Sequence, residues 1–222
     1  MSFALRPLVA VRRYAALNNA QPSGRRDGAT LIPSVFPHDL KLRPGLAGEN
    51  RVYDALANAL PAGWTVFYNA RIPRSRRSID FLIVVPKRGL VAIEVKGGLV
   101  HMRRGAMRQA QRRTPLQGKR IQPFLQLQRA LADLWRATNL PPGAVPTHLI
   151  AAFPHMSAKA YPWGPAQHVL TREDLDPECL GARLRNALPP LQGPEPKLDT
   201  LIAMLSSVPS RAPKRRRKTS KL

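Results

Sequence analysis

The fold is decided by residues 79–96, which read IDFLIVVPKRGLVAIEVK. Two apolar runs flank the turn-forming residues 86–89, PKRG, so this stretch predicts two adjacent β-strands, 79–85 and 90–96. Residues 64–72 predict another strand just before them. The centre of the chain is therefore expected to be a three-stranded meander.

Two carboxylates lie inside these apolar strands, Asp80 in the first and Glu94 in the second. Strand interiors rarely contain acidic residues without a reason. Side chains alternate along a strand, so Glu94 and Lys96 share one face. If the hairpin register places Asp80 opposite Glu94 or Lys96, all three groups converge on that face.

Converging carboxylates favour a bound cation, because two nearby negative charges repel each other. Hard oxygen ligands suit Mg²⁺ or Mn²⁺. Lys96, beside such a metal, could orient or deprotonate a water molecule. The alternative is a structural ion-pair cluster of Asp80, Glu94 and Lys96 that has no catalytic role.

Helices and further strands are predicted around the meander. Apolar residues recur at helical spacing in 48–60, and Glu49 lies on that apolar stripe. The other predicted elements are a helix at 122–138, strands at 147–153 and 167–170, and a helix at 197–206.

The charge of the chain points to a polyanionic partner. Lys and Arg number 36 against 13 Asp and Glu, a net charge of +23, and no acid occurs from Val95 to Ala132. We expect nucleic-acid phosphates to contact the cations of this stretch, which include Arg103, Arg104, Arg108, Arg112, Arg113, Lys119 and Arg120.

The single cysteine, Cys179, excludes an intrachain disulfide and favours a reducing, cytoplasmic location. No apolar run is long enough to span a membrane, so no membrane partner is expected. Two other cellular locations, organellar and nuclear, remain open. Residues 1–26 lack acids, as organellar presequences do, and residues 214–218, KRRRK, resemble a nuclear import signal.

The motifs Gly48-Glu49, Ile79-Asp80 and 93–96, IEVK, together resemble the nuclease-related domain (NERD) branch of the PD-(D/E)XK phosphodiesterases. This resemblance implies an α/β fold, in which helices flank a mixed central sheet with a restriction-endonuclease-like core. It also implies that Asp80 and Glu94 bind Mg²⁺ or Mn²⁺ and that Lys96 lies at the attacking water. Glu49 is implied as a further acidic group of the site. We expect the backbone carbonyl of Val95 to complete the metal ligands.

Residues 123–126, PFLQ, resemble the later Pro-x-x-Gln element of the same family, which implies a site role for Gln126. The phase of the predicted helix instead favours Gln128 for the core-facing side, so Gln128 is the second choice.

Four segments are expected: a basic, largely irregular arm at 1–45, a nuclease-like domain at 46–178, a helical extension at 179–210 and a disordered basic tail at 211–222. The predicted function is metal-dependent hydrolysis of phosphodiester bonds in DNA. Two alternatives remain open. One is a catalytically silent nucleic-acid-binding or assembly module that kept the nuclease fold. The other is an RNA-directed nuclease, because phosphate contacts do not distinguish the sugars.

Overall fold

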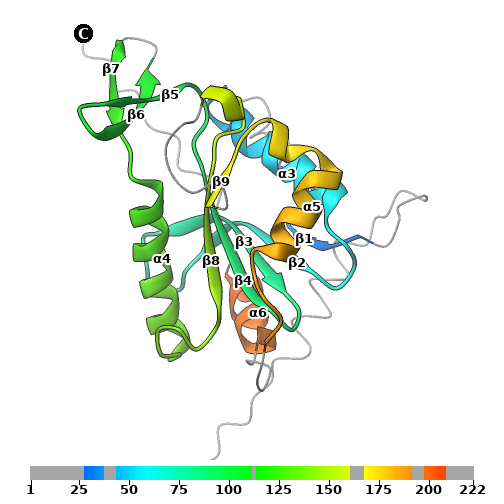
Figure 1. Cartoon of the computed structure of the whole chain (residues 1–222). Helices are drawn as coiled ribbons and strands as arrows, with labels where there is room; N and C mark the ends of the chain where they lie inside the picture. Colours follow the sequence, from blue (N-terminus) through cyan, green and yellow to red (C-terminus); the bar gives the residue numbers. More distant parts are fainter. Residues whose placement is uncertain (1–27, 38–43, 112–113, 161–167, 192–197, 209–222) are drawn as a thin grey trace, which may run out of the picture.

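The structure is a computed structural model that describes residues 28–37, 44–111, 114–160, 168–191 and 198–208 (Figure 1). Its main sheet has six strands in the order β1-β2-β3-β4-β8-β9. These strands are β1 (Thr30–Ile32), β2 (Thr65–Arg71), β3 (Ser78–Val85), β4 (Gly89–Val95), β8 (Thr147–Ala152) and β9 (Val169–Leu170). Short 3-10 turns occur at Pro44–Leu46, Ala158–Ala160 and Glu173–Leu175.

The sheet is mixed, as expected. Strands β2, β3 and β4 form the predicted antiparallel meander, whereas β1 pairs with β2, and β8 with β4 and β9, in parallel. The observed strands begin and end within one or two residues of the predicted ones, because the turn sequence at 86–89 and the apolar runs leave little choice of boundary.

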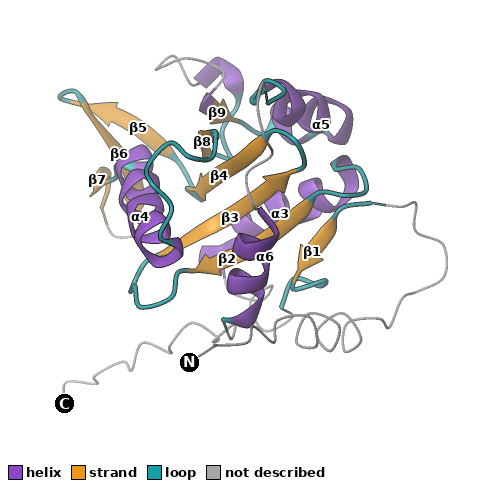
Figure 2. Cartoon of the chain, turned by 90° about the horizontal axis from the view of Figure 1, so that it is seen from below, coloured by secondary structure: helices purple, strands orange, loops and turns teal. Residues whose placement is uncertain are grey.

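Helices cover both faces of this sheet (Figures 1 and 2). Helices α3 (Ala47–Ala59) and α5 (Pro177–Asn186) pack on one face, which includes Ile83 and Ile93. Helices α4 (Pro123–Thr138) and α6 (Leu198–Ser207) cover the other face, which includes Leu82 and Val84. Both faces are apolar because β3 and β4 are buried on both sides. This α/β architecture is compatible with a restriction-endonuclease-like core.

A second, three-stranded sheet lies at the end of the molecule where α4 begins (Figure 1). It consists of β5 (Val100–Arg103), β6 (Ala106–Gln111) and β7 (Thr114–Arg120). Val100 and Met107 pack with Phe153 and Met156 of the main body. These three strands were not predicted from the sequence, in which the positive charge of this stretch is the main signal.

The folded part of the chain begins earlier than expected. Residues 1–45 were expected to be largely irregular, but β1 joins the main sheet and Phe36 is buried among the core aromatic residues. A short strand at a sheet edge leaves little periodic signal in the sequence, which explains the discrepancy. Residues 1–27 and the predicted tail at 211–222 lie outside the described residues.

The expected C-terminal extension packs against the same core. Leu180 and Leu184 of α5 lie in the core beneath α3, and Leu201 and Leu205 of α6 pack on the opposite face. Within the described part of the chain, every helix is too short or too polar to cross a membrane.

Candidate active site

The register of the meander brings Asp80 and Glu94 together. The β3–β4 pairing runs as far as Phe81 and Ile93, so Asp80 and Glu94 are the next residues beyond the last pair, and the charge of Glu94 acts on Asp80. The Val95 amide donates a hydrogen bond of 2.8 Å to Oδ2 of Asp80. Asp80 is thus held at the junction between the start of β3 and the end of β4, beside Glu94.

Lys96 lies beside Glu94. Its Nζ donates to Oε1 of Glu94 at 2.5 Å, and the two side chains are only 12% and 10% exposed. The Lys96 amide donates to the carbonyl of Ala152 on β8 at 2.8 Å, which fixes the end of β4 in the parallel pair. The expected proximity of Glu94 and Lys96 is therefore observed.

Glu49 approaches the same place from the first turn of α3. The hydroxyl group of Tyr68, on β2, donates to Oε2 of Glu49 at 2.7 Å. The helix can come this close because a Cβ atom on Gly48 would lie only 3.1 Å from the Cα of Gly97. Tyr68 was not among the residues predicted for the site; its only signal in the sequence was that a buried tyrosine needs a partner for its hydroxyl group.

The three acids influence one another electrostatically. Burial raises the pKa of the Asp80 carboxyl well above its usual 3.8, and the charges of Glu94 and Glu49 raise it further. Burial also raises the pKa of Glu49, although the hydrogen bond from Tyr68 acts in the opposite direction. The negative charges at this site are therefore only partly compensated by Lys96 and the Val95 amide.

The available donors fit a small divalent cation. A group of three or more His, Cys, Asp or Glu side chains arranged around a metal position is absent from the described residues. The site instead offers the carboxylates of Asp80 and Glu94. The N–H and C=O groups of one strand residue point to the same side, so the Val95 carbonyl should face Asp80 as its amide does. Hard oxygen donors and mutually repelling acids suit Mg²⁺ or Mn²⁺.

Neither candidate glutamine is buried. Gln126 and Gln128 are both exposed on α4, whose apolar stripe runs through Leu127, Leu131 and Leu134. The prediction that Gln128 faces the core is wrong, because it lies one residue beyond Leu127 and thus about 100° around the helix from it. Among the described hydrogen bonds, none joins the Gln126 side chain to the acids.

The predicted phosphate-binding cations are spread over the small sheet. Arg108 pairs across the strands with His101 and Arg120, so these three residues share one face. Arg103 follows His101 by two residues and lies on that face too. We call these four residues the basic face.

The remaining predicted cations lie elsewhere. Lys119 pairs with Gln109 and therefore projects from the opposite face, while Arg104 is at the exposed β5–β6 turn. Arg112 and Arg113 lie outside the described residues. The small sheet is attached next to the acids, because the Gln109 side chain donates to the carbonyl of Gly97, one residue after Lys96.

Comparison with known proteins matches residues 44–153 to the family model described as nuclease-related domain (NERD). No match was found among curated proteins or solved structures. The matched segment contains Glu49, Asp80, Glu94 and Lys96, together with the small sheet. The match confirms the resemblance that the sequence motifs indicated.

Proposed function

Residues 44–153 belong to the nuclease-related domain family, and from this premise we propose that the protein is a divalent-metal-dependent nuclease that hydrolyses phosphodiester bonds of DNA. The observation that carries the proposal is the convergence of Asp80, Glu94 and Lys96 at the open end of the β3–β4 hairpin. Acids that repel one another beside a lysine are unfavourable for a purely structural core.

Asp80, Glu94 and the carbonyl of Val95 would hold Mg²⁺ or Mn²⁺. A divalent cation bound there would supply Lewis-acid stabilisation of negative charge on the phosphate and a lowered pKa of water. The Val95 amide donates a hydrogen bond to Oδ2 of Asp80 and so orients the carboxylate. The other carboxylate oxygen, Oδ1, would be the one that faces the cation. Lys96 keeps its ammonium group one hydrogen bond from Glu94, where it can orient the attacking water.

Glu49 and Gln126 are the outer members of the proposed site. Glu49 would bind or orient a second water or cation, and Tyr68 would fix the direction of its carboxylate. Gln126 is assigned by resemblance, and its exposed position on α4 leaves it accessible to a substrate.

The basic face of the small sheet would bind the phosphate backbone. Arg103, Arg108 and Arg120 lie on one side of a sheet that begins at Val100, four residues after Lys96, and Arg108 also donates to the carbonyl of Gly118 at 3.1 Å. Phosphate contacts of this kind do not select the sugar, so DNA is proposed as the substrate and RNA is an outcome of the test. The single Cys179, which is exposed, is consistent with the proposed reducing, cytoplasmic location.

A catalytically silent binding module is the second candidate. The observation that favours it is the ion pair between Lys96 and Glu94, which partly neutralises the site with the chain's own residues. In that case divalent metal would not change thermal stability, whereas a metal site should raise the melting temperature as the metal concentration exceeds its Kd, with the logarithm of that concentration.

The proposed function is tested by incubating the protein with plasmid, linear duplex DNA, single-stranded DNA and RNA, each with Mg²⁺, Mn²⁺ or EDTA. We expect cleavage of at least one DNA substrate with metal and none with EDTA. Cleavage of RNA alone would reassign the substrate. Binding of nucleic acid without cleavage under any condition would support the silent module.

A further inference from the structure

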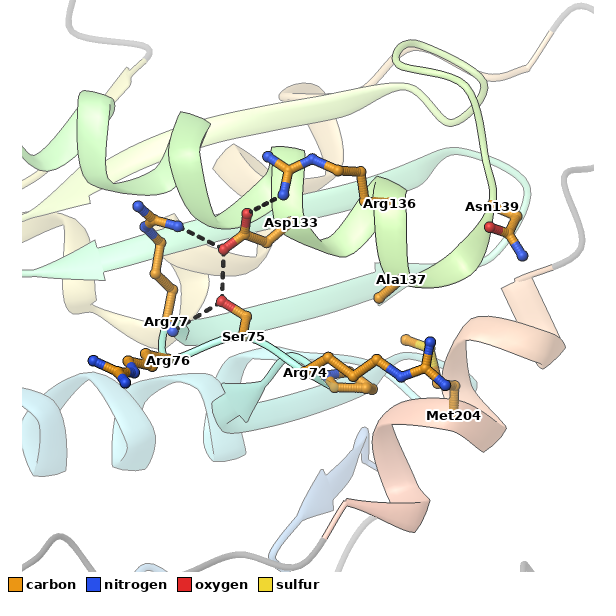
Figure 3. Close-up of a pocket in the computed structure, with 10 residues that line it drawn as sticks. Arg74, Ser75, Arg76, Arg77, Asp133, Arg136, Ala137, Asn139 and Met204 are labelled. Atoms are coloured by element: carbon orange, nitrogen blue, oxygen red, sulfur yellow. Dashed lines mark hydrogen bonds and ion pairs between the residues drawn. The ribbon is translucent and has the colours of Figure 1, made fainter.

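A cavity of about 920 Å³ is lined by residues other than Glu49, Asp80 and Glu94 (Figure 3). The β2–β3 loop, the second half of α4 and Met204 of α6 enclose it. We call it the arginine cavity, because its lining includes Arg74, Arg76, Arg77 and Arg136, with Ser75 and Asp133 between them. Its volume lies within the usual range of ligand-binding pockets.

Asp133 accepts hydrogen bonds from three other side chains of this lining. Its Oδ2 accepts from the hydroxyl group of Ser75 at 2.6 Å and from Arg77 at 2.7 Å, and its Oδ1 accepts from Arg136 at 2.8 Å. Figure 3 shows the two arginines reaching the carboxylate from different sides. These hydrogen bonds lower the pKa of Asp133 to about 2, so the carboxylate is ionised at neutral pH.

The two arginines bound to Asp133 present positive charge to the cavity. The side chains of Arg77 and Arg136 are 51% and 75% exposed, and each uses only one nitrogen on Asp133. Because Asp133 already accepts three hydrogen bonds, its charge is largely compensated and is a weak obstacle to an incoming anion.

Arg74 and Arg76 add uncompensated charge. Both are exposed, and no ion pair to either is present among the described residues. Arg74 has a left-handed backbone with φ of 60°, an uncommon conformation for a residue with a side chain. In Figure 3 its side chain extends toward Met204 across the cavity. The lining therefore carries four arginines against one acid.

This chemistry selects a phosphate group. Guanidinium groups bind phosphate oxygens in a bidentate manner, and Ser75 and Asn139 add polar groups to the lining. Few apolar side chains and no aromatic ring line the cavity, which disfavours a largely apolar ligand.

The arginine cavity is close to the acids along the chain. Arg77 precedes Asp80 by three residues, so their Cα atoms are at most about 11 Å apart. One nucleic-acid strand rises about 3.4 Å per nucleotide, so a strand positioned at Asp80 could reach the cavity within a few nucleotides.

We propose that the arginine cavity binds a phosphate group of the same nucleic-acid strand whose phosphodiester bond is presented to Asp80 and Glu94. This proposal rests on the proposed function and adds a second phosphate-binding position to it. The phosphate is either internal to the strand or the one at its 5′ end, and both are recognised by the same arginine chemistry.

The test is the double variant Arg74→Ala/Arg76→Ala, whose side chains are exposed and make no ion pair that holds the described fold together. The matched control is Lys87→Ala/Arg185→Ala, which also removes two positive charges. These two residues lie near the β3–β4 turn, at the opposite end of β3 from Asp80. Fluorescence anisotropy in EDTA measures the binding of a 3′-labelled single strand that carries a 5′-phosphate or a 5′-hydroxyl group. Melting temperatures verify that both variants are folded.

We expect the Arg74→Ala/Arg76→Ala variant to bind at least about tenfold more weakly than the control variant. The slope of log K against log salt should fall by about 0.7, the value for one phosphate contact on a single strand. An equal loss for both strands identifies an internal phosphate. A wild-type preference for the 5′-phosphate that disappears in the double variant identifies the terminal one.

Binding by the double variant that equals binding by the control would overturn the assignment of the cavity while leaving the nuclease proposal intact. Failure of the wild-type protein to bind any nucleic acid would overturn both proposals. Because binding is measured without metal, a protein that binds but does not cleave still tests the cavity.

Discussion

Gly48 on α3 and Gly97 after β4 approach so closely that a methyl group on Gly48 would lie 3.1 Å from the Cα of Gly97 and 3.0 Å from Pro154 Cγ. This contact sets the position of the first turn of α3, and therefore of Glu49, relative to the end of β4. The close approach that brings Glu49 to Tyr68 and the other acids depends on Gly48 having no side chain, whereas a Cβ on Gly97 would have no atom nearer than 4.0 Å.

Replacing Gly48 with Ala should displace Glu49 rather than unfold the protein. Alanine improves helix propensity by about 1 kcal/mol, which offsets much of the cost of overpacking, about 1–3 kcal/mol. We expect a small change in melting temperature but at least about a tenfold loss of cleavage rate, since small misplacements of site residues are costly. Gly45→Ala is the control, because a Cβ there has no atom within 4 Å. Equal activity of both variants would show that the position of Glu49 is not critical.

Lys96→Ala should affect turnover more than metal binding. If Lys96 acts on water, cleavage should fall about 10²–10⁴-fold. Removing its positive charge from beside Glu94 should leave Mn²⁺ affinity unchanged or stronger. Single-turnover rates and calorimetric titration of Mn²⁺ separate the two effects. Loss of Mn²⁺ binding in parallel with activity would instead indicate that Lys96 maintains the site structurally.

Asp80→Asn should stabilise the metal-free protein. The Asp80 carboxylate is penalised by burial and by the charges of Glu94 and Glu49, and an amide of the same shape can still accept from the Val95 amide. We therefore expect a higher melting temperature than wild type at neutral pH in EDTA. A lower one would favour the structural ion-pair cluster, in which Asp80 contributes to stability.

Asp133 should make stability depend on pH. Its pKa of about 2 in the folded protein is below its usual 3.8, so the ionised carboxylate stabilises the fold above 3.8 and loses this effect as the pH falls toward 2. The melting temperature of Asp133→Asn should lie below that of wild type at neutral pH, and the two should converge in acid. Asp199→Asn, on the exposed first turn of α6, is the control. A difference that persists at about pH 2 would show that the ionisation of Asp133 is not its cause.

The meander and its acids could be predicted because each leaves a local signal. Continuous apolar runs interrupted by the 86–89 turn define β3 and β4, and a carboxylate inside such a run is anomalous wherever it occurs. Alternation then places Glu94 and Lys96 together. Whether Asp80 would lie nearer to Glu94 or to Lys96 depended on the turn geometry, so the sequence left two registers open.

The small sheet and the arginine cavity could not be predicted in this way. Val100, Met107 and Ile121 are separated by arginines and glutamines, so their stretch resembles a basic loop as much as three strands. The cavity depends on a contact between Ser75 and Asp133, which are 58 positions apart in the chain. Asp133 had no feature in the sequence that distinguished it from an ordinary helical acid.

The central claim is that Asp80 takes part in metal-dependent cleavage, and the most direct test is the cleavage rate of Asp80→Asn beside wild type with Mn²⁺ and with EDTA. The account predicts that wild type cleaves DNA only with metal and that the variant is at least about a hundredfold slower. It also predicts that both proteins bind DNA equally in EDTA, since the basic face is unchanged. Cleavage by Asp80→Asn at the wild-type rate would contradict the account.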